Sequence, residues 1–584
     1  MNIKYPFLVL ATLFCFSCHE VVAQTASPTT ATIAAAARYD QGKSIFHPVY
    51  GRHGMVATEQ GLATEVGLNV LKKGGNAIDA AVAVAYSLAV VLPNAGNIGG
   101  GGFMLVYDAK SGKTTAIDFR EMAPILATKD MYLDEKGNVI DGKSMFTHFS
   151  VGVPGTVAGL ELAYEKWGTL PREDLITPAI ELAENGFEIS QTLGRMLETE
   201  RKNLGKWPST KTIFFKGNEP LKAGDRLVQK DLANALKLIL KEGKYAFYEG
   251  EIADKMVAEM KKHGGLISKE DLKAYRAIER EPVSGSYRGY EIVTMPAPSS
   301  GGIHLVQILN ILEHFPLREY GLNSAKTIHY YAEAMKLAYA DRSEFLGDPD
   351  FVSIPVKGLI SKEYANVQAQ SIDDIKVRPS LEIKPGQPQA YESDQTTHFS
   401  IIDKDGNAVV LTYTLNLNFG SGIVAEGTGI LLNNEMDDFS SKPGVPNAFG
   451  LIGGEANAIA PKKRPLSSMT PTIVMKDGKP FILTGSPGGA RIITTVLQSI
   501  VNIIDFELNP AQAILTPRVH HQWLPDEIRI EKGISPDTID ILKRQGYKVS
   551  EKATMGRVQI IQVGSDGYYG ASDTRNPDGK ALGY

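Results

Sequence analysis

The sequence of 584 residues contains only two cysteines, Cys15 and Cys18, and both lie close to its beginning. We interpret residues 1–23 as a signal peptide, so that the mature chain would begin near Gln24. Cleavage there leaves no thiol, which excludes disulfides and cysteine metal sites from the mature protein.

Three features of the first segment predict export to the periplasm or secretion. Lys4 gives a positive start, residues 7–16 form an apolar run too short to span a bilayer, and residues 21–23 fit a small-residue cleavage site. An alternative is a lipid anchor on Cys18, but the residues before it match that signal poorly.

Long apolar runs and blocks of like charge are also absent. No later segment reaches the 18 or so apolar residues of a transmembrane helix, so no stable membrane span is expected. The formal net charge is -5, and this mild acidity argues against a nucleic-acid-binding protein. Hydrophobic content of 43% and charged content of 22% are normal for a globular protein with a large core.

Two common site motifs are incomplete. The four glycines at 99–102 lack a following Gly-Lys-Ser/Thr and lead into a strand, which favours a tight turn or close backbone packing over phosphate binding. His329 and Glu333 lie four apart on a predicted helix without the second histidine of a metalloprotease motif, so internal polar pairing is expected. We therefore predict neither a metal nor a cofactor.

The first half of the chain is predicted to be mixed in secondary structure. Residues 79–91 read as a buried helix, and strands at 103–107 and 114–119 deliver Arg120 at a strand end. Residues 155–280 are mostly amphipathic helical segments, and we find no chemistry in them.

The stretch from 396 to 416 is the most informative. Two β-rich runs flank Asp405-Gly406, which predicts a hairpin. The first run opens with Thr396-Thr397, a pair that β-propensity alone can explain. A threonine hydroxyl becomes a nucleophile when its own α-amino group is the base, and this requires cleavage of the Gln395–Thr396 bond. The Pro-rich loop at 371–394 suits such a cleavage.

The last third of the chain adds further polar segments. They are acids after an apolar strand (431–439), a Pro/Gly loop of the kind that forms lids (442–450), the run Arg464–Pro471, and a glycine-rich turn (483–491) that leads into a helical pattern (492–500). Backbone N–H groups in that turn would make a good anion cradle.

Five motifs stand in a fixed order: the four glycines with Asp-Phe-Arg-Glu, then Gln-Thr-Thr-His, Asn-Asn-Glu-Met-Asp-Asp-Phe, Pro-Leu-Ser-Ser-Met and Gly-Ser-Pro-Gly-Gly. Together they resemble the γ-glutamyltranspeptidase family of the N-terminal-nucleophile hydrolase superfamily, from about Met55 to the end of the chain. The resemblance implies an α+β fold, a four-layer α/β/β/α sandwich with two mainly antiparallel sheets.

The resemblance also implies a self-cleaving proenzyme that yields a heterodimer. Its large subunit would be residues 24–395 and its small subunit residues 396–584, with Thr396 as nucleophile. The freed amine has an ordinary pKa of about 7.7–8.0 and can take the hydroxyl proton. The implied substrates are glutathione and related γ-glutamyl compounds, with water, amino acids or peptides accepting the glutamyl group. No cofactor is implied.

The resemblance assigns roles to further residues. Arg120 would bind the substrate α-carboxylate, Glu435 and Asp438 the α-ammonium, and Ser467 and Ser468 the carboxylate side of the glutamate.

Four residues would act around the nucleophile in this resemblance, and one would cover the pocket. Gly488 and Gly489 would supply the oxyanion hole, and Thr414 and Asn416 would position Thr396. Phe449 lies in the lid loop, where some bacterial members have tyrosine.

Two other functions remain open at this stage. An acylase of the same superfamily, acting on glutaryl-cephalosporins, is the near alternative, but a glutaryl group has no ammonium for Glu435 and Asp438. An exported binding protein without covalent chemistry would stay one intact chain and would have no reason to carry these motifs in order.

Overall fold

In a computed structural model of the chain, the described residues are Met1, 41–385, 397–442 and 454–584. The described residues from Gln41 onward belong to one compact unit. The predicted signal peptide, the cleavage-site residues Gln395 and Thr396, and Phe449 of the predicted lid lie outside the described residues.

Two seven-stranded sheets form the centre of the compact unit. The first sheet has the order β23 (Lys580–Gly583), β2 (Met55–Thr58), β12 (Thr397–Ile402), β13 (Ala408–Thr414), β3 (Gly101–Asp108), β4 (Lys113–Phe119), β9 (Ile278–Arg280). The second has the order β1 (Val49–Gly51), β22 (Tyr568–Ser572), β21 (Gln559–Val563), β17 (Lys479–Gly485), β16 (Thr472–Lys476), β11 (Tyr290–Thr294), β10 (Val283–Tyr287). Every neighbouring pair in both sheets is antiparallel.

The two sheets pack face to face, with β12 and β13 of the first sheet against β17 and β21 of the second. The strands therefore bury both faces, one against the other sheet and one against helices. This explains why β12 and β13 are buried at every residue instead of alternating between core and solvent.

Helices from the first part of the chain cover the outer face of the first sheet, with α2 on β12 and β13 and α3 on β3 and β4. This layer and its neighbours comprise α1 (Gly61–Lys72), α2 (Ala77–Val91), α3 (Thr156–Trp167), α4 (Arg172–Asn185), α5 (Gln191–Thr199), α6 (Arg201–Leu204), α7 (Pro208–Phe214), α8 (Lys230–Glu242), α9 (Lys244–Tyr248), α10 (Glu251–His263) and α11 (Lys269–Ala274).

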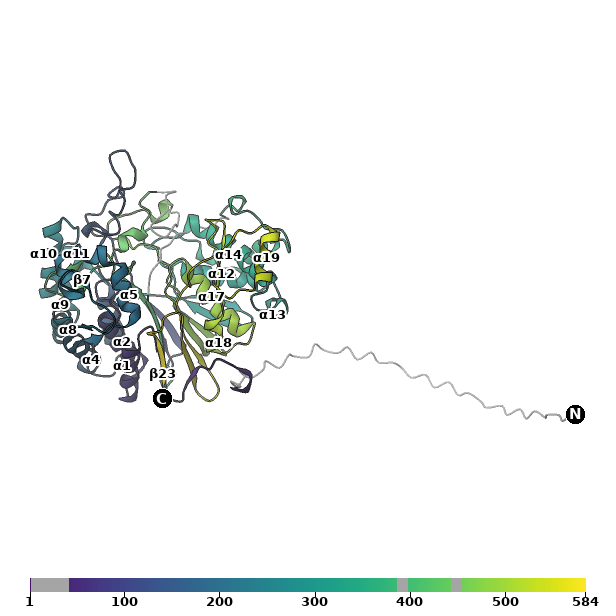
Figure 1. The fold of residues 1–584 in the computed structure, drawn as a ribbon, viewed down its shortest axis with the longest axis horizontal. Coiled ribbons are helices and arrows are strands. Elements are labelled where there is room, and N and C mark those ends of the chain that lie inside the picture. Colours follow the sequence, from purple (N-terminus) through teal and green to yellow (C-terminus); the bar gives the residue numbers. More distant parts are fainter. Residues whose placement is uncertain (2–40, 386–396, 443–453) are drawn as a thin grey trace. The chain divides into compact units, whose positions relative to one another are not determined.

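The remaining helices cover the second sheet, with α12 on β10 and β11 and α17 on β17. They are α12 (Gly301–Leu312), α13 (Leu317–Tyr320), α14 (Ala325–Phe345), α15 (Val356–Leu359), α16 (Lys362–Gln370), α17 (Arg491–Ile504), α18 (Pro510–Leu515) and α19 (Pro536–Gln545). Figure 1 shows the two helical layers on opposite sides of the strands. The predicted α/β/β/α sandwich is confirmed.

Short elements connect these layers. The strand pieces are β5 (Phe187–Glu188), β6 (Phe215–Lys216), β7 (Glu219–Pro220), β8 (Arg226–Leu227), β14 (Val424–Ala425), β15 (Ile430–Leu431), β18 (Val519–His520), β19 (Ile528–Ile530) and β20 (Val549–Glu551). The 3₁₀ turns are η1 (Gln41–Lys43), η2 (His148–Ser150), η3 (Ser380–Glu382), η4 (Glu435–Asp438) and η5 (Glu455–Asn457).

Helix α2 shows how local sequence sets the first layer. Asn76 caps its N-terminus in a capping box with Asp79, which satisfies backbone N–H groups that a helix start leaves open. Its small Ala and Val side chains are buried at all positions and let the helix lie against β12 and β13. The buried helix predicted over 79–91 is thus confirmed, with a start two residues earlier.

The four glycines at 99–102 serve close backbone packing, as predicted. A Cβ atom on Gly99 would lie 2.1 Å from the Leu431 oxygen, and one on Gly100 would lie 2.0 Å from the Thr414 oxygen. Both distances are far below van der Waals contact, so the turn before β3 can lie against β15 and the end of β13 only with glycine at these two positions. Among the described residues, no helix combines the length and the apolar character needed to cross a bilayer.

Candidate active site

One edge of the first sheet gathers several predicted site residues. Strand β12 begins at Thr397, paired with the end of β13. The last residue of β13, Thr414, faces Gly101 at the start of β3. Strand β4 runs antiparallel to β3 and ends beside its start, so Arg120 leaves the sheet at this same edge. Residues far apart in sequence are therefore neighbours here.

Arg120 is buried and holds two carboxylates at once. Its Nη1 donates to Glu435 and its Nη2 to Asp438, while Nε donates to the Pro465 oxygen at 3.1 Å and Nη2 also to the Leu466 oxygen at 2.9 Å. Burial disfavours the charged guanidinium, but the Glu435 and Asp438 carboxylates outweigh this and raise the pKa of Arg120. The arginine stays charged and fixed in orientation.

The acids around Arg120 outnumber its single charge. Glu121, 3.6 Å from the Arg120 guanidinium, is also fully buried. Burial and then the Glu435 carboxylate raise the pKa of Glu121, and the same two causes in the same order raise that of Asp438. We call Arg120, Glu121, Glu435 and Asp438 the Arg120 cluster. Within it, burial and the neighbouring carboxylate make Glu121 and Asp438 harder to deprotonate than exposed acids.

Several oxygens of the Arg120 cluster lack donors. Both Glu121 oxygens, Glu435 Oε2 and Asp438 Oδ1 are buried and receive no hydrogen bond from an N–H or O–H of the described residues. The hydroxyl of Ser468, two residues after Leu466, is also buried and has no hydrogen-bond partner among the described residues. Such groups are costly unless a ligand completes them.

The Ser467–Ser468 segment is held by the turn that precedes α12. Ser300 donates from its N–H and its hydroxyl to the Ser467 oxygen, at 2.8 and 2.9 Å. Ser467 Oγ accepts from the Met469 N–H at 3.2 Å. Both predicted serines are therefore fixed next to Leu466, whose carbonyl contacts Arg120.

Two asparagines that sequence reasoning left without a role fix the acidic turn η4. Asn433 accepts from the Gly152 N–H at 2.9 Å and from the Glu435 N–H at 3.0 Å. Asn434 accepts from the Leu417 N–H at 3.0 Å and donates to the Met145 oxygen at 3.0 Å. The Asn-Asn pair directly before the acids was the sequence feature that could have pointed to this supporting role.

Thr414 and Asn416 lie beside this turn. Thr414 Oγ1 accepts from the Asn416 N–H at 2.8 Å, and Asn416 Nδ2 donates to the Asn434 oxygen at 3.0 Å. Asn416 has a φ of 75°, a left-handed conformation that asparagine tolerates better than most residues. The end of β13 is thus coupled directly to the segment that carries Glu435.

Gly488 and Gly489 form the turn between β17 and α17. Their φ angles are 133° and 59°, both in the region that favours glycine. Their carbonyls accept from the N–H groups of Arg491 and Ile492. Neither glycine N–H donates to another described residue, so both remain available for an anion.

The turn lies near the start of β12. A Cβ atom on Gly485, which ends β17, would lie 2.4 Å from the His398 ring, so the two strand ends touch. Thr397, Thr414 and Arg120 therefore lie at one edge of the first sheet, and the strand that leads to the glycine turn touches β12 there.

Glu59 is a site residue that sequence reasoning missed. It is buried, accepts from Thr397 Oγ1 at 2.9 Å and pairs with Arg557 at 2.8 Å. Burial raises the pKa of Glu59, although Arg557 and the Thr397 hydrogen bond oppose this. Because β2 and β12 are neighbours only in the folded sheet, no local pattern could have linked Glu59 to Thr397.

The His329–Glu333 pair has the structural role that was predicted. His329 Nδ1 and Glu333 Oε1 both contact the Tyr547 hydroxyl, at 2.8 and 2.6 Å. The three side chains are buried and tie α14 to the segment after α19.

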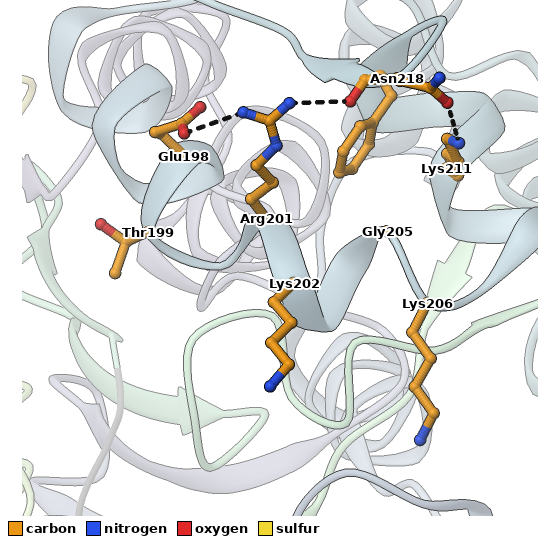
Figure 2. A pocket seen from close by; sticks show the side chains of 9 residues that line it. Glu198, Thr199, Arg201, Lys202, Gly205, Lys206, Lys211 and Asn218 are labelled. Atoms are coloured by element: carbon orange, nitrogen blue, oxygen red, sulfur yellow. Dashed lines mark hydrogen bonds and ion pairs between the residues drawn. The ribbon is translucent and has the colours of Figure 1, made fainter.

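A separate surface pocket of about 550 Å³ lies over α5, α6 and α7. Figure 2 shows Arg201 directed toward Glu198 and Asn218, and Lys211 directed toward Asn218. The pocket is basic, but two of its cations are held by its own lining. It shares no residue with the Arg120 cluster.

Comparisons with known proteins agree with this arrangement. The profile of the family described as Gamma-glutamyltranspeptidase matches residues 63–583. The chain is 56% identical over 587 residues to "Glutathione hydrolase proenzyme" of Escherichia coli (strain K12), covering 100% of each chain.

Solved structures show the same fold. The cephalosporin acylase from Bacillus halodurans superposes with a TM-score of 0.83 at 30% identity, over 94% of this chain and 99% of that chain. The Helicobacter pylori γ-glutamyltranspeptidase superposes with a TM-score of 0.55 at 52% identity, over 56% of this chain and 93% of that chain. The motif order, the fold and these similarities agree, and the chain belongs to the γ-glutamyltranspeptidase family.

Proposed function

We propose that this protein cleaves the γ-glutamyl amide bond of glutathione and related compounds. The glutamyl group passes through an enzyme ester to water, or to an amino acid or peptide amine. The proposal includes self-cleavage of a proenzyme between Gln395 and Thr396.

The Arg120 cluster is the observation that carries this proposal. A glutamate with a free α-amino and α-carboxyl group presents one cation and one anion side by side. Its ammonium has three donors for the open oxygens of Glu435 and Asp438. Its carboxylate matches the planar fork of Arg120 and the unpartnered Ser468 hydroxyl.

Binding of such a zwitterion exchanges one set of ion pairs for another. The guanidinium contacts to Glu435 and Asp438 are partly replaced by contacts to the substrate carboxylate, and the two acids turn to the ammonium. The charges of the α-ammonium and the α-carboxylate of the substrate cancel, so binding leaves the net charge of the buried cluster unchanged, which limits the desolvation cost.

The reaction then needs a nucleophile, a base and an oxyanion site. In the proposed reaction the Thr396 amine takes the proton from the Thr396 hydroxyl, and the oxygen attacks the γ-carbonyl carbon. The N–H groups of Gly488 and Gly489 stabilise the oxyanion that forms. The amine returns the proton to the leaving nitrogen, the amide bond breaks and the ester remains. Water or an acceptor amine repeats the sequence and releases glutamate or the new γ-glutamyl product.

Three observations support the placement of Thr396 in this role. It directly precedes Thr397, the first residue of β12. Thr397 is fixed by Glu59, and Thr414 and Asn416 lie across the neighbouring strand end. Gly485, three residues before the glycine turn, lies against the His398 ring of β12.

We propose the same processing scheme for the whole chain. Residues 1–23 would be removed on export to the periplasm or exterior, leaving a large subunit of residues 24–395 and a small subunit of residues 396–584. The two remain associated as a heterodimer.

The acylase alternative is weaker for a physical reason. A glutaryl group has no ammonium, so its binding would leave buried oxygens of Glu435 and Asp438 without donors. The higher identity to the glutathione hydrolase proenzyme than to the cephalosporin acylase points the same way.

Denaturing gels and intact mass measurement of wild type, Thr396→Ala and the control Thr114→Ala test the proposal. Wild type and control should give two fragments, the smaller beginning at Thr396, and Thr396→Ala one inactive chain. Each protein is then assayed with a γ-glutamyl anilide and the matching glutaryl anilide. Activity of the intact Thr396→Ala chain, or another N-terminus on the small fragment, would overturn the mechanism. Preference for the glutaryl compound would establish the acylase instead.

A further inference from the structure

Two histidines and a glutamate gather outside the sheet-edge site. His148 lies in η2, and Glu259 and His263 lie one turn apart on α10. His148 Nε2 is 2.9 Å from Glu259 Oε1, and His263 Nε2 is 3.5 Å from the same oxygen. One ligand atom from each residue lies within 4.8 Å of the other two. We propose that His148, Glu259 and His263 form a binding site for a divalent transition-metal ion such as Zn²⁺.

The donor set fits this class of ion. Two imidazoles and one carboxylate are a common protein ligand set for zinc with one open position. Zn–N bonds of about 2.0–2.1 Å place tetrahedral ligand atoms roughly 3.3 Å apart. The distances from Glu259 Oε1 to the two histidine nitrogens, 2.9 and 3.5 Å, lie on either side of that value. Imidazole ligands favour Zn²⁺, Co²⁺ or Ni²⁺ over Mg²⁺ and Ca²⁺.

Two of the three residues are buried and the third is partly exposed, so a metal ion could enter from the solvent side. The side chains of His148 and Glu259 are 2% and 5% exposed, whereas that of His263 is 35% exposed. An ion would reach the site along His263 and keep a water molecule on the exposed side. The i, i+4 spacing on α10 places Glu259 and His263 on one helix face without strain.

Neighbouring side chains and backbone contact all three ligands. Trp207 packs its ring edge-on to both imidazoles, at centroid distances of 4.9 Å from His148 and 5.9 Å from His263. Glu259 Oε2 accepts from the Glu426 N–H at 3.4 Å, which leaves Oε1 directed at the histidines.

Binding requires one side-chain movement. The His148 and His263 rings stack at 4.6 Å with an angle of 15° between their planes, and parallel rings cannot both direct lone pairs at one ion. His263 is the more exposed ring and lies farther from Trp207 than His148 does, so it is the ring that can rotate out of the stack.

A bound ion would connect α10 to the segment that supports the acidic turn. Residues just before His148 contact that turn, because Ser144 Oγ donates to Asp437 Oδ1 at 2.6 Å and the Met145 oxygen accepts from Asn434 at 3.0 Å. The proposed ion therefore acts as a clamp between a helix of the outer layer and the support of Glu435 and Asp438. The sequence predicted no chemistry in residues 155–280, which contain two of the three ligands.

The test uses untagged full-length protein, freed of metal with a chelator and titrated with Co²⁺. Wild type should bind one Co²⁺ with visible d–d absorption, and Zn²⁺ should displace it. Glu259→Gln and His263→Ala should each weaken binding more than about 100-fold, because even outer-shell partners contribute about 10- to 100-fold. His314→Ala, which removes an exposed histidine elsewhere, should bind like wild type.

Two further measurements separate this site from the active site. Thr396→Ala should bind Co²⁺ like wild type, so failure of the proposed catalytic function would leave this result unchanged. Hydrogen exchange of residues 143–150 should slow when Zn²⁺ is added. Equal Co²⁺ affinity of Glu259→Gln, His263→Ala and wild type, or no binding by wild type, would overturn the proposal.

Discussion

Replacing Arg120 with lysine is the sharpest test of the Arg120 cluster. The guanidinium makes four contacts with two carboxylates and two carbonyls, and all four donors are spread over a planar fork. Lysine keeps the charge but concentrates its donors on one atom. It can face Glu435 or Asp438, but the contact to the other acid is lost, and so is bidentate binding of a substrate carboxylate.

The magnitude follows from the lost contact. One charge-assisted hydrogen bond contributes about 1.5–3 kcal/mol. If the loss falls on the bound donor substrate, kcat/KM should fall about 10- to 150-fold, mainly through a higher donor KM. The melting temperature should fall as well, because a buried acid loses part of its partner.

Steady-state kinetics with a γ-glutamyl anilide and thermal unfolding should be measured together. Arg288→Lys is the matched control, since Arg288 also holds one carboxylate, that of Asp505 at 3.1 Å, and two backbone carbonyls. The control should lower the melting temperature and leave the donor KM unchanged. If Arg120→Lys behaves like this control, Arg120 does not bind the donor carboxylate.

Three further changes test other parts of the site. Glu59→Gln keeps an acceptor for Thr397 but removes the charge beside Arg557. Self-cleavage should slow, and the free energy of unfolding should fall by about 1.5–3 kcal/mol. Unchanged gels and melting curves would refute this. Because the pKa of Glu121 is raised in the folded protein, protonated Glu121 contributes fully to folding stability below its ordinary pKa of 4.5. This contribution is lost as the pH rises through the raised pKa. Glu121→Gln should therefore gain melting temperature relative to wild type as the pH rises above 4.5, and a pH-independent difference would contradict the shift. Gly488 has a φ of 133°, which strains an alanine, so Gly488→Ala should distort the turn that presents the N–H groups. The variant should lower kcat more than it changes donor KM, and an unchanged kcat would exclude Gly488 from the oxyanion site.

Much of the first sheet could be predicted from sequence. The hairpin around Asp405-Gly406 and the strand that delivers Arg120 have local signals in turn residues and β-rich runs, and both were confirmed. The order of motifs identified the family and with it the sandwich. These features depend on short stretches of chain, where periodicity and turn chemistry are informative.

The contacts between distant segments could not be predicted in this way. Glu59 meets Thr397 only because β2 pairs with β12, and His148 meets α10 only because the intervening helices fold back. The direct ion pairs of Arg120 with Glu435 and Asp438 were also not predicted, since the resemblance assigned Arg120 to the substrate carboxylate and the two acids to its ammonium. Partners more than a hundred residues apart have no spacing rule.

The order of strands in the two sheets has a consequence for the proposed cut between 395 and 396. In the first sheet β12 and β13, which follow the cut, lie between β2 and β3, which precede it, so strands from both sides of the cut pair with one another. In the second sheet β1 and β11 from before the cut border β22 and β16 from after it.

Each sheet therefore contains strands from both fragments. Pulling the fragments apart would break strand pairs in both sheets, so dissociation and unfolding are the same event. If the proposed cut occurs, we expect the two fragments to unfold together as one nicked chain and not to exchange between molecules. Fragments produced separately would have to fold in each other's presence, whereas the uncut precursor carries both halves at high effective concentration.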